Sequence, residues 1–217
     1  MRSATRWLCV LSVVAIITTT AAADDCCWQQ LCNGKDLTGW MNANGDAPGE
    51  GWKVEDGAIV RRGSAGNLFT KKRYGDFTVE LEFKTDANSG ILLRCDEPKN
   101  YVQTCIEVQV LPPVATPGKH SCGALYDMLT PTKEMCKKDE WNKYSITMKG
   151  PKVTVVLNGE TICEADLDQW TTGNQNPDGS RNKFKTALAE FKREGHFGVQ
   201  DHGGLVMYRN IRIKELK

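Results

Sequence analysis

Apolar and polar residues alternate in many short stretches of this sequence, and the pattern leaves few folds open to the chain. Phe77, Val79, Leu81 and Phe83 alternate with polar residues through 77–84. A period of two places the apolar side chains on one face of a β-strand. Shorter stretches of the same kind are residues 58–61, 90–94, 105–111, 144–148, 153–157, 197–201 and 208–213. We therefore expect an all-β protein whose two antiparallel sheets pack as a sandwich.

One segment, residues 166–195, departs from this alternation. It begins with a polar loop and continues with Phe184, Leu188 and Phe191 before Gly195. The apolar spacing is that of an amphipathic helix, and the glycine is a typical helix stop. The sequence thus predicts one short helix, placed in an insertion that covers one end of the sandwich.

The N-terminus has the pattern of a secretory signal peptide. Arg2 and Arg6 precede an apolar run that ends in small residues at Ala23. The run is shorter than the roughly 20 residues of a membrane-spanning helix, and no comparable run follows. We expect residues 1–23 to be a cleaved signal, residues 24–217 to form one domain without a membrane span, and the protein to be secreted or periplasmic.

The charge balance argues against nucleic acid as a partner. The chain has 28 Lys and Arg and 27 Asp and Glu, and with Arg2 and Arg6 removed the remainder carries a formal net charge of −1. A nucleic-acid-binding surface normally needs a basic excess. The one basic cluster, residues 71–73, is typical of a solvated turn.

Cysteine usage fits an oxidising compartment. Of the 9 cysteines, Cys9 lies in the signal. The other eight are Cys26, Cys27, Cys32, Cys95, Cys105, Cys122, Cys136 and Cys163. An even number in an exported chain favours disulfides, and closeness along the chain suggests the pairs Cys95 with Cys105 and Cys122 with Cys136. A zinc site is the alternative, which the absence of any C-x-x-C pair disfavours.

Ten short motifs, in order along the chain, resemble the 3-keto-disaccharide hydrolase family. Residues 31–40, LCNGKDLTGW, are similar to the opening signature L-F-N-G-K-D-L-x-G-W of that family, with Cys32 in place of Phe. The others are WKVEDG at 52–57, YGDF at 74–77 with ELEF at 80–83, NSGI at 88–91 with Arg94, IEVQV at 106–110, GALY at 123–126, EWN at 140–142, LNG at 157–159, GVQDHG at 198–203 and RNIRI at 209–213. The resemblance covers essentially all of residues 24–217.

The resemblance implies a fold and a chemistry. Such proteins are similar to jelly rolls of the laminin-G and concanavalin type, which hold a ligand on a concave face. The implied substrates are glycosides already oxidised to a ketone at carbon 3. The ketone acidifies the C2 hydrogen, so a base can remove it, the group on C1 is expelled, and water adds to the double bond. This needs a base at C2, a cation, donors or a divalent metal ion at the C3 oxygen, and an acid for the leaving oxygen.

Strand periodicity indicates which polar residues meet. If Ile106, Val108 and Val110 face the core, Glu107 and Gln109 face the opposite side. By the same argument Gln200 and His202 project outward after the strand that contains Phe197 and Val199. Asn88 and Arg94 do the same on the strand around residues 90–94. His120 and Asp127 lie in loops, where catalytic residues are often found. We expect catalytic roles for Glu107, His120 and His202, and substrate binding by Asn88, Arg94, Gln109, Asp127 and Gln200.

Each of these residues also has a purely structural interpretation. Glu107 and Gln109 can be the solvated side of a strand. Arg94 can be held in an ordinary salt bridge, and the two histidines can be surface or turn residues. Glu107, His120, Asp127 and His202 also carry suitable atoms for a metal, although their spacing matches no known cage.

Three functional hypotheses remain open. The first is an exported hydrolase or lyase of 3-keto-glycosides, with a carbohydrate as its partner. The second is a carbohydrate-binding module without activity, since the fold alone does not separate binding from catalysis. The third is a structural role in a cell envelope, which the many cysteines favour.

Overall fold

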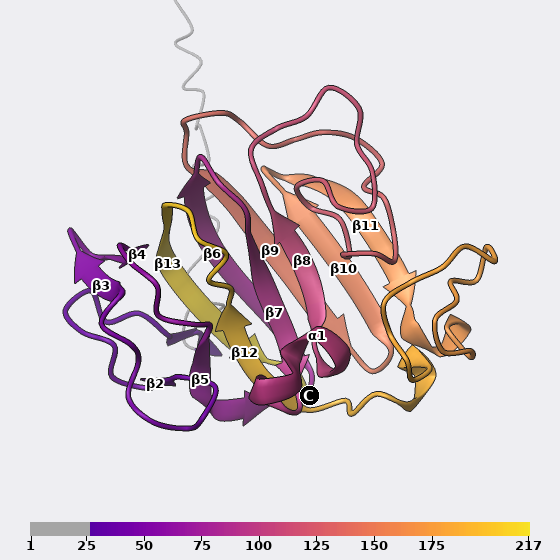
Figure 1. Cartoon of the computed structure of the whole chain (residues 1–217), viewed down its shortest axis with the longest axis horizontal. Helices are drawn as coiled ribbons and strands as arrows, with labels where there is room; N and C mark the ends of the chain where they lie inside the picture. The colour runs from indigo at the N-terminus through magenta and orange to yellow at the C-terminus, as the bar shows by residue number, and fades with distance from the viewer. Residues whose placement is uncertain (1–26) are drawn as a thin grey trace, which may run out of the picture.

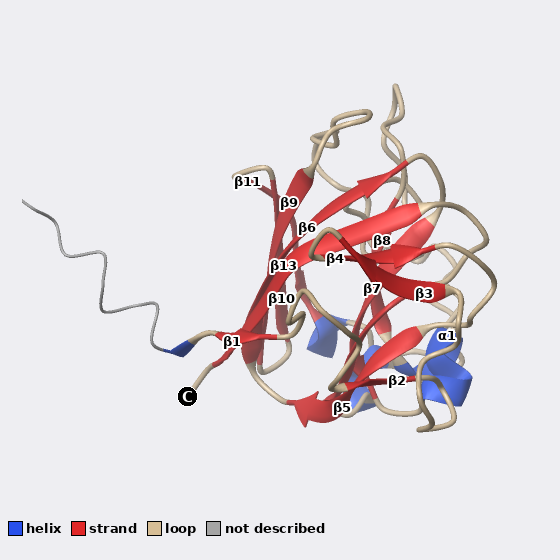
Figure 2. Ribbon diagram, turned by 90° about the vertical axis from the view of Figure 1, so that its left-hand side faces the viewer, coloured by secondary structure: helices blue, strands red, loops and turns tan. Residues whose placement is uncertain are grey.

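The computed structural model describes residues 27–217, so the expected signal peptide lies outside the described residues. These residues form two antiparallel sheets packed face to face, seen from the side in Figure 2. The larger sheet has the order β11-β10-β9-β6-β13-β4-β3, with β1 also paired to β13. The smaller has the order β2-β5-β12-β7-β8. The predicted all-β sandwich is confirmed (Figure 1).

The strands are short, as expected for a sandwich. Those of the larger sheet are β1 (Gln29–Gln30), β3 (Trp52–Glu55), β4 (Ala58–Arg61), β6 (Phe77–Thr85), β9 (Asn142–Lys149), β10 (Lys152–Leu157), β11 (Glu160–Asp166) and β13 (Val206–Glu215). Those of the smaller sheet are β2 (Trp40–Met41), β5 (Leu68–Tyr74), β7 (Ser89–Cys95), β8 (Ile106–Val110) and β12 (Gly195–Val199). Every stretch predicted from alternation overlaps one of these strands.

The core lies between the two sheets and is built by this alternation. Phe77, Val79, Leu81 and Phe83 of β6 are all buried, while the intervening side chains are partly exposed. From the smaller sheet, Ile106, Val108 and Val110 of β8 join the same cluster, with further residues of β7 and β12. The outer face of the smaller sheet is therefore left to the remaining side chains of β7, β8 and β12.

The predicted helix is wrong in position. Residues 166–195 contain only two single-turn 3-10 helices, Leu167–Gln169 and Leu188–Glu190. Phe184 and Leu188 are buried as the pattern indicated. The backbone around them, however, bonds to distant segments: Phe184 O accepts from Asn174 N at 2.5 Å, and Lys185 N donates to the side chain of Gln103 at 2.9 Å. These bonds replace those of a helix.

The short α-helix instead lies in the connection between β7 and β8. It is α1 (Tyr101–Thr104), preceded by a 3-10 turn at Pro98–Asn100. No helix within residues 27–217 is long and apolar enough to cross a membrane.

Of the two suggested disulfides, one is present. Cys95 and Cys105 are joined and link the end of β7 to the start of β8. Cys122 and Cys136 are free thiols in contact with each other, so the second pairing is wrong for this structure.

Candidate active site

Glu107 fits on the outer face of the smaller sheet because β7 carries a glycine beside it. In the register of β7 and β8, Gly90 lies opposite Gln109 and Leu92 lies opposite Glu107, so these side chains share the outer face. A Cβ atom on Gly90 would lie 2.5 Å from Glu107 Oε1. The missing side chain of Gly90 therefore provides the space that the carboxylate of Glu107 occupies.

Glu107 is a buried acid paired with a lysine that the sequence did not single out. The residue is only 4% exposed, and its Oε2 lies 3.1 Å from Lys183 Nζ. The same ammonium group lies 4.4 Å from the centre of the Tyr126 ring. Burial of a charged group is costly unless it is paired with an opposite charge. Lys183 supplies that charge from the loop before β12.

Residues 119–129 bring three more polar side chains to the free edge of β8. This segment pairs with β8 through bonds such as Tyr126 N to Glu107 O at 2.9 Å. His120 lies over the Tyr126 ring, with 4.5 Å between ring centres, and its Nε2 is 3.2 Å from Asp127 Oδ1. Burial raises the pKa of Tyr126, and the negative charges of Glu107 and Asp127 raise it further. His120 thus packs against the ring of Tyr126, and Asp127 binds His120.

These elements enclose a pocket of about 200 Å³. It is lined by Asn88, Tyr101, Val102, Glu107, Tyr126, Lys183, Gln200 and His202. Four of the lining residues belong to the set expected from the sequence. The other four, from α1 and from two loops, do not. Gln109, His120 and Asp127, also expected from the sequence, are neighbours of the lining rather than part of it.

Two amide oxygens beside this pocket have no hydrogen-bond partner. Among the described residues, Gln109 Oε1 and Gln200 Oε1 are the buried side-chain atoms left in this condition. Gln109 uses its Nε2 to donate to Asn88 Oδ1 at 2.9 Å. An unpartnered buried acceptor costs about 1–3 kcal/mol, so such atoms need an explanation. Gln200 lines the pocket, so a ligand with a hydroxyl donor can satisfy its oxygen.

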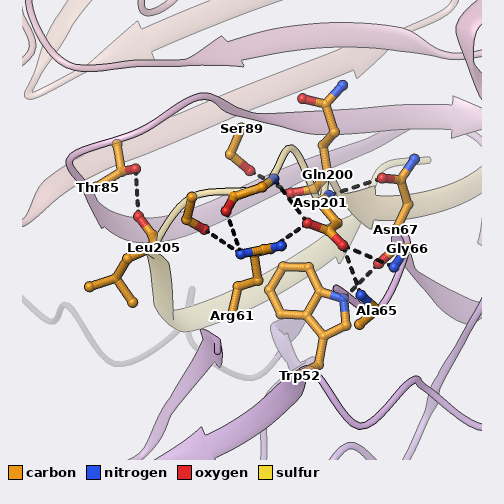
Figure 3. A network of polar contacts seen from close by, with 12 residues as sticks. Trp52, Arg61, Ala65, Gly66, Asn67, Thr85, Ser89, Gln200, Asp201 and Leu205 are labelled. Atoms are coloured by element: carbon orange, nitrogen blue, oxygen red, sulfur yellow. Dashed lines mark hydrogen bonds and ion pairs between the residues drawn. The ribbon is translucent and has the colours of Figure 1, made fainter. Parts of the chain in front are cut away.

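A buried ion pair fixes the turn that carries His202. Asp201 pairs with Arg61 and accepts from Ala65 N at 2.9 Å and Gly66 N at 3.0 Å, while Arg61 Nη1 donates to Gly203 O at 2.8 Å. Figure 3 shows this network, with the amide of Gln200 directed away from it. Burial alone raises the pKa of Asp201, but the hydrogen bonds from Ala65 and Arg61 outweigh it and the pKa is lowered.

Arg94 departs from the expectation, because it does not reach the pocket. Its guanidinium donates to Gly75 O and Gly150 O, each at 2.7 Å, and pairs with Asp76 at 2.7 Å. Its side chain is 2% exposed, so no donor faces a ligand. The structural alternative holds for Arg94, which ties two loops to the end of β7. Lys183 is the cation of the pocket instead.

A larger cavity, of about 570 Å³, lies beside β10 and β11. Trp170, Met128 and Leu129 form part of its wall, and Trp170 donates through Nε1 to Asn176 Oδ1 at 2.7 Å. The cavity contains none of the residues predicted to act, and no buried acid is paired with a base there. We therefore place the candidate active site at the smaller pocket.

The described residues do not form a metal cage. No group of three or more His, Cys, Asp or Glu side chains within residues 27–217 is arranged to hold an ion. Glu107 is engaged by Lys183, and Asp127 by His120. No metal ligands are assigned.

Comparisons with known proteins agree with the motifs found in the sequence. Residues 27–214 match the family described as the 3-keto-alpha-glucoside-1,2-lyase-like domain. A protein of Bacteroides thetaiotaomicron named 3-keto-disaccharide hydrolase is 32% identical over 222 residues, covering 85% of this chain and 77% of that protein.

Solved structures give the same result. A crystal structure of a candidate glycosyl hydrolase from Parabacteroides distasonis is 32% identical, with a TM-score of 0.78, and covers 87% of this chain and 99% of that one. A carbohydrate-binding module from Bacillus subtilis, at 13% identity and a TM-score of 0.50 over 82% of this chain and 96% of that one, shares the fold alone. The chain belongs to the 3-keto-alpha-glucoside-1,2-lyase-like domain family.

Proposed function

We propose that this protein is an exported enzyme that breaks the glycosidic bond of sugars carrying a ketone at carbon 3. One observation carries the proposal: a buried carboxylate, Glu107, is paired at 3.1 Å with the ammonium group of Lys183 in a pocket lined by sugar-compatible polar groups. Membership of the family and the hydrolase name of the Bacteroides relative support it.

Glu107 is the base in the first step. It takes the proton from C2, and the electron pair of the broken C–H bond forms the enolate, C2=C3–O⁻. Before the step, the charge of Lys183 is balanced by Glu107; after it, Glu107 is neutral and the enolate oxygen balances the same ammonium group. The net charge of the pair and the sugar stays constant, and a fixed cation next to the developing charge lowers the barrier.

His202 supplies a proton in the second step. The enolate returns to the ketone as the C1–O bond breaks, which leaves a C1=C2 double bond and requires a proton on the departing oxygen. His202 is exposed and lines the pocket. Water then adds across the double bond, with its hydroxyl on C1 and a proton on C2. The sum is hydrolysis.

Asn88 and Gln200, which line the pocket, hold the ring. Gln200 presents an unpartnered oxygen, which accepts a hydrogen bond from a sugar hydroxyl group. Asn88 lines the pocket and is oriented by Gln109. His120 and Asp127 act through Tyr126 and position it.

The decisive experiment compares two carboxylate variants. Glu107→Gln keeps the shape of the side chain but not its basicity, so turnover of a 3-keto-disaccharide falls by about 10²–10⁴-fold. Glu164→Gln, in the larger cavity, is the matched control and retains wild-type turnover. Thermal unfolding of both variants is the control that checks whether each still folds. Full activity of Glu107→Gln, or loss of activity in Glu164→Gln alone, overturns the assignment.

A carbohydrate-binding module without activity is the second candidate. The unpartnered amide oxygen of Gln200 favours it, because it suits a bound sugar whether or not a bond is broken. Incubation of the protein with unmodified and 3-oxidised disaccharides separates the two functions. Product from the oxidised sugar supports the enzyme, and binding of either sugar without product supports the module.

A further inference from the structure

The helix α1 sits on a small apolar cluster of its own, away from the main core. Tyr101 packs against this cluster on the outer face of the smaller sheet, and Figure 2 shows α1 on that side of the sandwich. The cluster consists of Phe69, Leu92, Cys95 and Cys105, with Met41 and Ala43 at its margin. Tyr101 therefore anchors the helix next to the polar pocket.

Two further connections hold α1 in place. The Cys95–Cys105 disulfide closes the segment that contains the helix. The side chain of Gln103 donates to Lys183 O and accepts from Lys185 N, each at 2.9 Å. The helix is thus tied both to the sheet and to the loop that presents Lys183. Such a preorganised surface loses little entropy when a ligand binds.

The surface that α1 offers to the pocket is apolar. Tyr101 and Val102 both line it, and Val102 is 40% exposed. Among the described residues, Val102 and Leu205 are the large hydrophobic side chains that are exposed. An exposed apolar side chain on a fixed helix at the rim of a polar pocket is where a ligand with an apolar face gains most from burial.

The volume of the pocket also indicates that part of the ligand lies at the rim, beside α1. About 200 Å³ is less than the roughly 300–1,000 Å³ of pockets that enclose drug-sized ligands. The reacting ring, held by the polar residues, fills most of it. The group attached at C1 must then extend to the rim.

We infer that Tyr101 and Val102 form the subsite for the leaving group, which they bind through the apolar C–H face of its ring. This inference rests on the proposed function and adds what the enzyme prefers at C1. The enzyme then favours 3-keto-glycosides whose leaving group is a ring over those that release a small alcohol. The side chains of α1 determine the preference for the leaving group, while Glu107 and Lys183 carry out the chemistry.

The test uses two substrates with the same oxidised glucosyl unit, one releasing glucose and one releasing methanol. Because each variant is compared with wild type on the same substrate, differences in leaving-group reactivity cancel. Val102→Ser lowers kcat/KM for the disaccharide by about 5–20-fold, mainly through KM, which is the effect of losing part of a buried apolar contact. For the methyl glycoside kcat/KM changes less than about twofold.

Leu205→Ser is the matched control, since it removes the other exposed large hydrophobic side chain, which is not among the pocket-lining residues. It leaves both substrates at wild-type rates. An equal fall for both substrates in Val102→Ser, or no change in either, overturns the inference.

Failure of the proposed function gives a different result. If wild type turns over neither substrate, calorimetry measures its binding of the unmodified disaccharide and of methyl glucoside. Weaker disaccharide binding in Val102→Ser, with methyl glucoside unaffected, then supports the ring subsite of a binding module. Equal binding by wild type and variant, or no binding to wild type, overturns the subsite as well.

Discussion

Lys183 Nζ lies 3.1 Å from Glu107 Oε2, although the two residues are 76 positions apart in the sequence. The pair joins the edge strand β8 to the loop before β12. Its side chains are 18% and 5% exposed, so the attraction is far less screened than in a surface pair. The pair gives the pocket a base and a cation at one point.

Removal of the cation is expected to impair catalysis, and it also destabilises the fold because the buried carboxylate of Glu107 loses its partner. In Lys183→Met the developing enolate loses its counter-charge, and kcat for a 3-keto-disaccharide falls by about 10²–10³-fold. Lys183→Arg restores a measurable part of the rate because the charge returns. Steady-state kinetics and urea unfolding check this, and equal kcat in Lys183→Met and wild type would contradict the role of Lys183.

Gly90 is expected to be required for the position of Glu107. Gly90→Ala places a Cβ within 2.5 Å of Glu107 Oε1, so the carboxylate must move. A displacement of about 1 Å can reduce the rate about 10²-fold. Gly75→Ala is the control, since the nearest atom to its Cβ would be 3.8 Å away. Kinetics of the two variants, with unfolding curves, separates an effect on the site from an effect on the fold.

The ion pair of Arg61 and Asp201 is expected to stabilise the fold at neutral pH. Its side chains are 10% and 7% exposed. Arg61→Gln leaves a buried carboxylate without its partner, so it lowers the free energy of unfolding by about 3–5 kcal/mol. The exposed pair of Arg62 and Glu55 provides the control, because solvent screens it and Arg62→Gln changes the free energy of unfolding far less. Urea unfolding at pH 7 measures both, and equal losses would refute the difference.

The same pair gives the stability a definite pH dependence. The pKa of Asp201 is lowered in the folded protein from an ordinary value of 3.8. Its stabilisation is therefore complete above that value and is lost as the pH falls through the lowered folded pKa. The unfolding free energy of Arg61→Gln should vary less over this acid range than that of wild type. Urea unfolding between about pH 2 and 6 tests it, with Arg62→Gln as reference.

Loss of the disulfide is expected to destabilise the chain and loosen α1. Cys95→Ser with Cys105→Ser lowers the free energy of unfolding by about 2–4 kcal/mol, since the unfolded chain is no longer constrained. The variant also discriminates less between the ring and methyl leaving groups described above. Urea unfolding and the ratio of the two kcat/KM values are the measurements, and an unchanged ratio would show that Gln103 and the apolar cluster suffice to hold the helix.

Much of the fold was predictable because the alternation of apolar and polar residues along a strand indicates which side chains are buried. The pattern of β6 and β8 placed Phe77 and Val108 in the core and turned Glu107 and Gln109 to the other face. It failed for Arg94, because the loops at Gly75 and Gly150 bind its guanidinium. Alternation separates the two faces of a strand, but it does not tell a ligand-binding face from one covered by loops.

The residues that the sequence did not reveal come from irregular segments. Lys183, Tyr126 and Tyr101 reach the pocket through loops and a single helical turn, where no period links a residue to a face. The apolar spacing of Phe184 and Leu188 was correct as a sign of burial and misleading as a sign of helix. Long-range backbone bonds, which leave no local pattern, decided that segment.

Proton exchange at C2 tests the role of Glu107 most directly. A 3-keto sugar with hydrogen instead of a leaving group at C1 can undergo the first step but not the second. In D₂O, followed by NMR, wild type should exchange the C2 hydrogen much faster than the C4 hydrogen, which the ketone also acidifies, and Glu107→Gln should abolish this difference. Equal rates at C2 for wild type and Glu107→Gln would contradict the account.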